Sequence, residues 1–324
     1  MSRPTLRDVA TRAGVSTAAA SLALRDLAGV SASTRESVLE AAAELGYVVN
    51  VAARNLRRQR TGTIGIYLPP GVTLQWYYAD VALGVTDAAG ARGVAALILP
   101  QSGDPRAFVP YTDGIVTIDV SREDATARAL LESGVPIVTG EAVPEELPRP
   151  TGVVFVDHYA RAREVLAHLV GRGAARIGVL LPPDDTVWGA EVARAVREFG
   201  GAETQSVSVA FSPTSDEIRA ACARLVDVDA IIAIPDGTAT SVAGFLRAHD
   251  HEIGSDVLLA SYTDTLADRL LDPPVTALDL RPRELGARLA THLLDVLDGS
   301  AANPHEEFDV EWHFRASTRG RLID

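Results

Sequence analysis

The stretch TLRDVATRAGVSTAAASLAL at residues 5–24 decides the fold of the N-terminal part of the chain. Thr5 and Asp8 have the spacing of a capping box, in which each side chain accepts a hydrogen bond from the backbone of the other. Gly14 ends this first helix, because glycine readily adopts the left-handed conformation found after helices. Ser16 is placed to cap a second helix that runs to the end of the stretch. Two short helices joined by a glycine-containing turn predict a helix-turn-helix.

A third helix follows this pair and completes a small all-α head. We expect it to begin at Ser31 or Ser33 and to end at Gly46. Apolar residues at helical spacing form its predicted buried side: Val38, Leu39, Ala42 and Leu45.

Charge is divided unevenly between this head and the rest of the chain. The whole sequence has a net charge of −13, but residues 1–61 contain nine Arg and five acidic residues, a net charge of +4. The remainder therefore carries −17. A basic head on an acidic body predicts that only the head contacts a polyanion such as DNA.

Length and composition exclude several classes of protein. A chain of 324 residues with 47% hydrophobic content can bury two or three domain cores. Its apolar runs, such as 64–68 and 95–99, fall far short of the roughly 20 residues that span a bilayer. The N-terminus lacks an apolar signal core, so we expect a cytoplasmic protein. Cys222 is the single cysteine, which excludes an internal disulfide and a cysteine-based metal cluster.

After Arg60 the sequence alternates between apolar strands and amphipathic helices. The expected strands are 63–68, 94–99, 114–119, 136–140, 152–156, 176–181, 206–210, 230–234 and 257–262. The expected helices are 77–91, 123–133, 158–172, 187–199, 215–226, 238–249 and 282–298. Continuous apolar strands that alternate with helices predict parallel sheets covered on both faces. The series divides near Val156, which predicts two doubly wound lobes with a ligand site in the cleft between them.

The order and spacing of these segments resemble those of the LacI/GalR family of bacterial transcription regulators. The resemblance is carried by residues 5–16, 30–50, 52–69, 77–93 and 311–320. It implies a homodimer that binds a palindromic operator in double-stranded DNA. It also implies a body like that of the periplasmic binding proteins, which usually senses a small-molecule effector.

The resemblance divides the chain into a head, a hinge and a body. The head covers 1–49, the hinge helix or linker 50–61, and the body 62–324. Lobe 1 of the body is expected to comprise about 62–156 and 281–308, and lobe 2 about 157–280 and 309–324.

Family position implies a set of phosphate contacts in the head: Ser16, Ser21, Ser31, Thr34 and Tyr47. The backbone of Leu6 and the side chains of Thr5 and Asn50 are weaker candidates. Such contacts fix the register of a recognition helix on the duplex. The alternative is that Thr5, Ser16 and Ser31 serve only as helix caps, although one hydroxyl can serve both purposes.

Base reading falls, by the same resemblance, to Thr17, Ala18 and Leu22. Family members often have long polar residues there, commonly Arg at the position of Leu22. Alanine and leucine offer no hydrogen bond to guanine, but they can contact the methyl group of thymine. Arg25 stands where the family often has Asn and could reach a phosphate or a base edge. The alternative for Leu22 is a place in the small core of the head.

The segment NVAARNLRRQR at residues 50–60 resembles the hinge helix of the family. The match rests on Asn50, Ala53, Arg54 and Leu56. It implies that Leu56 from each subunit enters the minor groove at the centre of the operator, where an apolar wedge unstacks a base step and kinks the duplex. The alternative is a solvated basic linker.

Sugar-sensing relatives hold their ligand with an Arg, an Asn-Asp pair and a pair of Asp residues, and this chain departs from that pattern. Trp188 stands at the position of the Arg. Pro235 replaces the Asn, while Asp236 remains. Thr263 replaces the first Asp of the last pair, while Asp264 remains. The polar groups that recognise the paired oxygens of a polyol are therefore partly absent.

Aromatic side chains could bind a flat or partly apolar ligand in place of these anchors. The candidate effector-binding residues are Trp76, Tyr77, Tyr78, Asp157, Trp188, Asp236, Tyr262 and Thr263. The alternatives are that the aromatic residues only pack between the lobes, or that the body has lost effector control and serves to dimerise the head.

Other functions have little support in the sequence. The chain lacks the nucleophile-elbow, zinc-protease and phosphate-loop motifs, so we expect no catalytic residues, no cofactor and no metal site. His249 and His251 lie in a polar segment typical of solvated surface. A solute-binding protein would share the two-lobed body, but a capped helix-turn-helix stands where its signal peptide would be. An enzyme on the same scaffold would need catalytic residues that no motif supplies.

Overall fold

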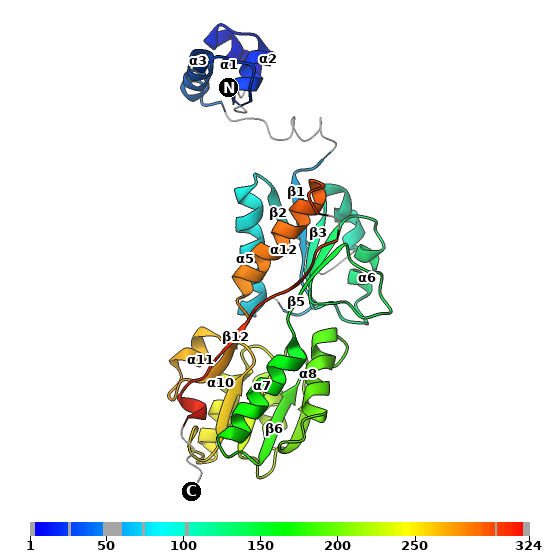
Figure 1. Ribbon diagram of the computed structural model, residues 1–324, viewed down its shortest axis with the longest axis vertical. Helices are drawn as coiled ribbons and strands as arrows, with labels where there is room; N and C mark the ends of the chain where they lie inside the picture. Colours follow the sequence, from blue (N-terminus) through cyan, green and yellow to red (C-terminus); the bar gives the residue numbers. More distant parts are fainter. Residues whose placement is uncertain are drawn as a thin grey trace. The chain divides into compact units, whose positions relative to one another are not determined.

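The computed structural model describes residues 4–24, 27–47, 60–72, 75–100, 104–301 and 303–319. The chain forms two compact units, Met1–Thr61 and Gly62–Asp324, and each is described by itself (Figure 1).

The N-terminal unit contains the three helices that the sequence predicts: α1 (Leu6–Ala13), α2 (Thr17–Leu24) and α3 (Ala32–Glu44). Thr5 and Asp8 form the expected capping box at the start of α1. Gly14 follows α1 with φ 66°, a left-handed conformation in which a larger side chain would be strained. The core that these helices bury is small and rich in alanine: Val9, Ala10, Ala20, Ala23, Val38, Ala41 and Ala42.

One residue of the predicted core of α3 does not lie in it. Leu39 is 51% exposed, whereas Val38 and Ala42 are buried. Successive residues of a helix point about 100° apart, and Val38, Ala41 and Ala42 define the side that faces the core. Leu39 therefore lies outside that side, and the expectation that it packs with Val38 is wrong.

The C-terminal unit contains two six-stranded sheets, as the predicted fold class requires. The first sheet has the order β11-β5-β4-β3-β1-β2 and defines lobe 1. Its strands are β1 (Thr63–Tyr67), β2 (Ala95–Ile98), β3 (Ile115–Ile118), β4 (Ile137–Gly140), β5 (Gly152–Phe155) and β11 (His305–Glu307). All of its pairings are parallel.

The second sheet has the order β12-β10-β9-β8-β6-β7 and defines lobe 2. Its strands are β6 (Arg176–Leu181), β7 (Glu203–Ser208), β8 (Ala230–Ala233), β9 (Leu258–Ser261), β10 (Thr276–Asp279) and β12 (Glu311–His313). Only the pairing of β10 with β12 is antiparallel among these strands. The chain passes between the lobes after β5, β10 and β11.

Helices cover both faces of each sheet (Figure 1). Lobe 1 contains α5 (Trp76–Ala91), the 3-10 helix η1 (Pro105–Tyr111), α6 (Ala125–Leu131) and α12 (Pro282–Leu297). Lobe 2 contains α7 (His158–Gly171), α8 (Val187–Arg197), α9 (Ser215–Cys222), α10 (Thr238–Ala248), α11 (Leu266–Leu270) and the 3-10 helix η2 (Ala316–Thr318). Successive strand residues alternate between faces, so Ile64 and Ile66 lie in the core beneath α5 and α12, while Tyr67 lies in the core beneath α6.

The two long helices of lobe 1, α5 and α12, cross in close contact. A Cβ atom added to Gly84 of α5 would lie 2.0 Å from the backbone oxygen of Arg283, and one added to Gly286 of α12 would lie 2.1 Å from that of Val81. The backbones approach so closely that only glycine fits at either position. This contact joins residues that are about 200 positions apart in the chain.

The structure differs from the predicted elements in a few places. The strand expected at 206–210 is β7 at Glu203–Ser208, and η1, η2, α11, β10 and β11 are not among the expected elements. These missed elements have three to seven residues each, which is too short for a clear hydrophobic period. Within the described residues, no helix is long and apolar enough to cross a membrane.

Candidate functional site

The N-terminus of α3 gathers hydroxyl groups. Ser31 Oγ accepts a hydrogen bond from the Thr34 backbone N–H at 3.1 Å and lies 3.0 Å from Ser33 Oγ and 2.8 Å from Thr34 Oγ1. The first turn of α3 contains no acidic residue. The positive end of the helix dipole and these hydroxyls together favour an anion such as a phosphate.

The other predicted phosphate contacts lie on or near helix starts. Ser16 Oγ accepts a hydrogen bond from the Ala19 backbone N–H at 3.1 Å, and Thr5 caps α1. Both residues are exposed, so capping leaves their side chains at the surface. Leu6 and Tyr47 are half-buried against the alanine-rich core, and Ser21 is half-buried on α2.

The exposed side of α2 presents methyl groups. Thr17 and Ala18 are exposed, while Ala20 and Ala23 are buried. Leu22 is half-buried, and its Cδ1 atom lies 3.4 Å from the position that a Cβ atom on Gly29 would take. This side offers the Thr17 hydroxyl and several apolar carbons to a ligand.

The remaining predicted DNA contacts lie outside the residues that the structure describes. They are Arg25, Asn50, Ala53, Arg54 and Leu56.

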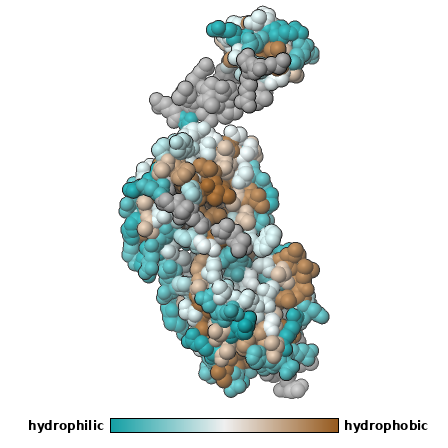
Figure 2. Space-filling view, turned by 180° about the vertical axis from the view of Figure 1, so that it is seen from behind, coloured by the Kyte–Doolittle hydropathy of each residue, from teal (hydrophilic) through white to brown (hydrophobic). Residues whose placement is uncertain are grey.

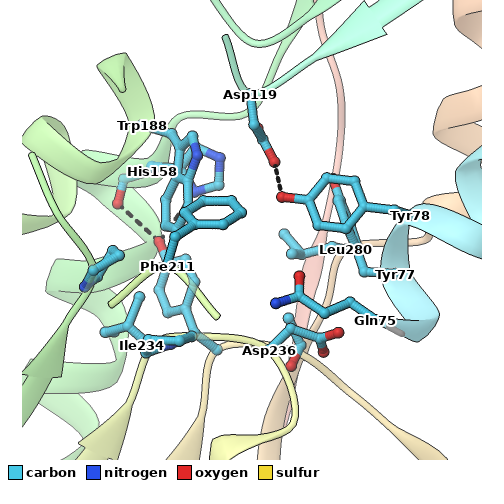
Figure 3. A pocket seen from close by; sticks show the side chains of 14 residues that line it. Gln75, Tyr77, Tyr78, Asp119, His158, Trp188, Phe211, Ile234, Asp236 and Leu280 are labelled. Atoms are coloured by element: carbon cyan, nitrogen blue, oxygen red, sulfur yellow. Dashed lines mark hydrogen bonds between the residues drawn. The ribbon is translucent and has the colours of Figure 1, made fainter. Parts of the chain in front are cut away.

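A cavity of about 40 Å³ lies between the two lobes of the body (Figure 3). On the same measure one water needs roughly 10–15 Å³, so the cavity holds a few waters and a larger ligand would need the lobes to separate. Residues from the start of α5 and the end of β3 line it from lobe 1. Residues that follow β6, β7, β8 and β9 line it from lobe 2, at the carboxyl ends where doubly wound sheets bind ligands.

Most of the candidate effector-binding residues line this cavity. They are Tyr77, Tyr78, Trp188, Asp236, Tyr262 and Thr263. Trp76 is 76% exposed and lies outside the lining. Asp157 also lies outside it, because its Oδ1 accepts a hydrogen bond from the Ala160 backbone N–H at 2.8 Å and so caps α7.

Asp264, which matches a ligand anchor of the family, forms ion pairs with arginine side chains outside the cavity lining. Arg315 donates to both of its carboxylate oxygens at 2.7 Å, and Arg269 donates to Oδ2 at 3.2 Å. These hydrogen bonds lower the pKa of Asp264 against the effect of its burial. Asp279 and His313 lie beside it and could complete a metal-ligand triad, but the two guanidinium groups already neutralise the central carboxylate.

Two acidic residues near the cavity match no family motif in the sequence. Asp119 follows β3 with φ 52°, and Glu141 follows β4 with φ 73°. A left-handed conformation costs a non-glycine residue about 1–3 kcal/mol, and such residues gather at ligand sites. The visible signal is an acid directly after a buried apolar strand, at the edge of the sheet that faces the cleft.

Asp119 is buried and bonded to an aromatic residue of the cavity. Tyr78 Oη donates a hydrogen bond of 2.6 Å to Asp119 Oδ2 (Figure 3). Burial raises the pKa of Asp119 to about 7, while the hydrogen bond from Tyr78 lowers it and the nearby Glu141 raises it further. Asp119 can therefore exchange a proton near neutral pH.

His158, Glu141 and Tyr262 form a buried network that joins the lobes. Tyr262 Oη donates to the backbone oxygen of His158 at 3.1 Å and lies 3.3 Å from His158 Nδ1, which must then act as a donor. His158 Nε2 lies 3.2 Å from Glu141 Oε1. Burial lowers the pKa of His158, but Glu141 offsets that effect and the pKa is raised overall. An imidazolium paired with the Glu141 carboxylate fits both contacts.

Three buried polar atoms of the cavity wall have no hydrogen-bond partner among the described residues: Trp188 Nε1, Asp236 Oδ1 and Thr263 Oγ1. Buried polar groups are nearly always satisfied in folded proteins, since leaving one unpaired costs about 1–3 kcal/mol. All three residues line the cavity, and a donor, an acceptor and a hydroxyl gathered there indicate a site for a polar ligand or for ordered water.

The head and the body together define a class of protein: a DNA-binding regulator that carries a two-lobed body of the ligand-binding type. Residues 5–50 match the family model for bacterial regulatory proteins of the lacI family, and residues 166–318 match the periplasmic binding protein-like domain.

The chain belongs to the LacI family of DNA-binding transcriptional regulators. It is 31% identical over 323 residues to the HTH-type transcriptional regulator CelR of Thermobifida fusca, covering 93% of this chain and 94% of that one. It is 25% identical over 336 residues to the HTH-type transcriptional repressor CytR of Escherichia coli strain K12, covering 97% and 96%.

Solved structures share the fold of this chain. A complex of CelR with cellobiose matches with a TM-score of 0.71 and 28% identity, covering 97% of this chain and 100% of that one. The lac repressor dimer bound to operator and the anti-inducer ONPF matches with a TM-score of 0.79, covering 98% and 99%. At 21% identity, the second likeness concerns the fold alone.

Proposed function

We propose that this regulator is a homodimeric repressor that binds a palindromic operator and is released by a small molecule bound between the lobes. The observation that carries the proposal is the set of unpartnered buried atoms on Trp188, Asp236 and Thr263, three residues that line one aromatic cavity. A ligand that pairs with them would change the separation of the two lobes. Since the chromosome lies in the cytoplasm of a bacterium, we also propose a cytoplasmic location.

Relatives support an effector of the saccharide type. The structure of CelR holds cellobiose, and aromatic rings such as Trp188 and Phe211 stack well on the apolar faces of sugar rings. The absent sugar anchors at Trp188, Pro235 and Thr263 argue for a mode of binding that relies more on ring stacking.

The DNA interface that we propose has two kinds of contact, those to phosphates and those to base edges. The hydroxyls of Ser16, Ser21, Ser31 and Thr34 hold phosphates with Tyr47, and Thr5, Leu6 and Asn50 add weaker contacts. Thr17, Ala18 and Leu22 meet the major groove, where their methyl groups favour thymine. Arg25 reaches a phosphate or a base edge. A hinge at 50–61, with Asn50, Ala53, Arg54 and Leu56, lies between the head at 1–49 and the body at 62–324 and enters the minor groove.

Exposed apolar side chains on the body support a dimer. Leu83 of α5 and Ile98 of β2 are exposed in lobe 1, and Leu266 and Leu270 of α11 are exposed in lobe 2. Figure 2 shows hydrophobic surface on both lobes. Apolar surface of this kind is common where subunits meet.

The test combines operator binding with a conservative change in the cavity. Selection of bound fragments from the genome should return a palindromic consensus, and fluorescence anisotropy should then show operator release by a saccharide. Thr263→Val removes one hydroxyl at nearly constant volume and should weaken that response. Thr291→Val, which removes a hydroxyl bonded to the Ala287 backbone oxygen on the exposed side of α12, is the matched control and should leave it unchanged. A consensus without symmetry would contradict the proposal, and so would an operator affinity that no saccharide alters.

A further inference from the structure

The lining of the cavity is unevenly charged. Asp119 and Asp236 contribute carboxyl groups, and no Arg or Lys is among the lining residues of the described chain. His158 is the one basic side chain in that lining. Its charge is already balanced, because Nε2 lies 3.2 Å from the buried Glu141 carboxylate. His158 also acts electrostatically on Asp119 and lowers the pKa of that carboxyl group. Asp236 is therefore the lining carboxyl group on which no cation of the described residues acts.

The carboxyl groups stand at opposite ends of an aromatic box. Figure 3 shows Asp119 above the open space and Asp236 below it, with Phe211 and Trp188 on one side and Tyr78 on the other. The ring centroids of Phe211 lie 6.3 Å from those of both Tyr78 and Trp188. Aromatic faces attract cations as well as the apolar faces of ring-shaped ligands.

The unpartnered atoms determine which hydrogen-bond donors and acceptors a ligand needs. Burial raises the pKa of Asp236, while the nearby Thr263 side chain and the Tyr77 and Gly237 backbones lower it. Asp236 Oδ1 itself has no partner at hydrogen-bond distance among the described residues, and as a carboxylate oxygen it accepts a donor from the ligand. Trp188 Nε1 donates only, so it requires an acceptor, and the Thr263 hydroxyl accepts either. A protonated amine offers the first and a hydroxyl group offers the second. A phosphate or carboxylate near Asp236 would instead face a carboxyl group with no Arg among the described lining residues to balance it.

We propose that the cavity recognises a hydroxylated ring that carries a protonated amine, the chemistry of an amino sugar, and that it rejects anionic sugars. The amine is held by Asp236 and lies among the aromatic rings, while hydroxyl groups of the same ring pair with Trp188 Nε1 and Thr263 Oγ1. This inference rests on the proposed function, in which the cavity is the effector site.

Matched sugars test the inference. Glucosamine differs from glucose by an ammonium in place of one hydroxyl, and the β-1,4-linked disaccharide of glucosamine differs from cellobiose in the same way. Binding is measured by isothermal titration calorimetry on the full-length protein. Of the two amino sugars, the one that binds more tightly should bind at least about tenfold more tightly than its neutral counterpart, because a hydrogen bond to a charged group is stronger than one between neutral groups. Glucose 6-phosphate should show no binding.

A single substitution identifies the residue responsible. Asp236→Asn keeps the size of the side chain and removes its charge, so the amine-to-neutral preference should fall to about threefold or less. Asp216→Asn makes the same chemical change at an exposed position of α9 and should leave the preference intact. Near-ultraviolet circular dichroism before titration checks that each variant keeps its fold.

Two results would overturn the inference. Equal or tighter binding of the neutral sugars would refute the amine and leave the effector site in place. Absence of binding by glucosamine, glucose, the glucosamine disaccharide and cellobiose alike would refute it as well. The proposed function fails separately, when no saccharide that binds the protein changes its affinity for the operator.

Discussion

The head and the cavity of this regulator are built by opposite means. The head takes its form from neighbours in sequence: Thr5 bonds Asp8, Ser16 bonds Ala19, and Ser31 bonds Thr34. The cavity depends on residues that are far apart in sequence: Tyr78 bonds Asp119 within lobe 1 and His158 bonds Tyr262 within lobe 2, over 41 and 104 residues of chain. Local contacts fix a small scaffold with few buried side chains, whereas distant contacts create an enclosed environment that shifts pKa values.

Substitution at the crossing of α5 and α12 tests the dependence of the body on distant contacts. Gly84→Ala would place a Cβ atom 2.0 Å from a backbone oxygen, and the helices must separate to admit it. We expect the body to lose about 3 kcal/mol of unfolding free energy or more, measured by urea denaturation. Gly244→Ala on α10, where a Cβ atom meets nothing within 4 Å, is the matched control. It should be neutral or stabilising by up to about 1 kcal/mol, and equal losses in both variants would refute the role of close contact.

The proposed wedge tests whether the DNA-binding part extends beyond the locally folded head. Leu56→Ala should lower operator affinity by about 30-fold or more and reduce DNA bending in a gel-shift comparison, because the kink depends on the inserted side chain. Leu39→Ala changes an exposed leucine of α3 and should leave both measurements nearly unaltered. Unchanged bending with Leu56→Ala would assign 50–60 to a linker.

The methyl-rich side of α2 makes a prediction about specificity. Leu22→Arg should introduce a preference for guanine at one position of each half-site, of about 1–3 kcal/mol, because arginine can bond guanine O6 and N7. Selection from a random pool of operators measures the change. An unaltered consensus would remove Leu22 from the reading surface and assign it to packing beside Gly29.

The smallest expected effect is the pH dependence of stability that comes from Asp119. It tests whether this carboxyl group is buried at the cavity. Its folded-state pKa of about 7 is raised above the ordinary value of 3.8, so the native protein holds the proton more tightly than the unfolded chain does. The stability from this proton is complete below pH 4 and is lost as the pH rises through 7.

The comparison with Asp119→Asn isolates this effect. The stability of the protein relative to the variant should fall by about 1.4 kcal/mol between pH 5 and pH 6. A difference that stays constant over this range would show that Asp119 is not buried as described.

The same contrast explains how far the sequence could predict the molecule. Caps, turns and long apolar strands are local signals, and the three head helices and both doubly wound sheets follow from them. Leu39 was misassigned because four apolar positions of a short helix do not define its buried side. Burial of α3 is set by the two neighbouring helices.

The cavity shows more clearly how far prediction from the sequence can go. Trp188, Asp236 and Thr263 could be found because family position marks them. Asp119 and His158 carry no motif. Their roles arise from distant partners, Tyr78 of the same lobe for Asp119 and Glu141 of the other lobe for His158. Asp264 matches a family anchor by position, yet Arg315 holds it away from the cavity, a pairing over 51 residues that no local pattern reveals.

If ligand binding in the cavity controls operator binding by the head, the two binding equilibria are thermodynamically linked, and this linkage can be measured directly. Operator affinity should be measured by fluorescence anisotropy with and without one saturating sugar. That sugar is whichever of glucosamine, glucose, the glucosamine disaccharide and cellobiose binds most tightly. The affinity for that sugar should then be measured with and without operator. Because coupling between two ligands is reciprocal, the account predicts that each lowers the affinity for the other by the same factor, about 5-fold to 150-fold. Identical operator affinity in the presence and absence of the bound sugar would contradict it.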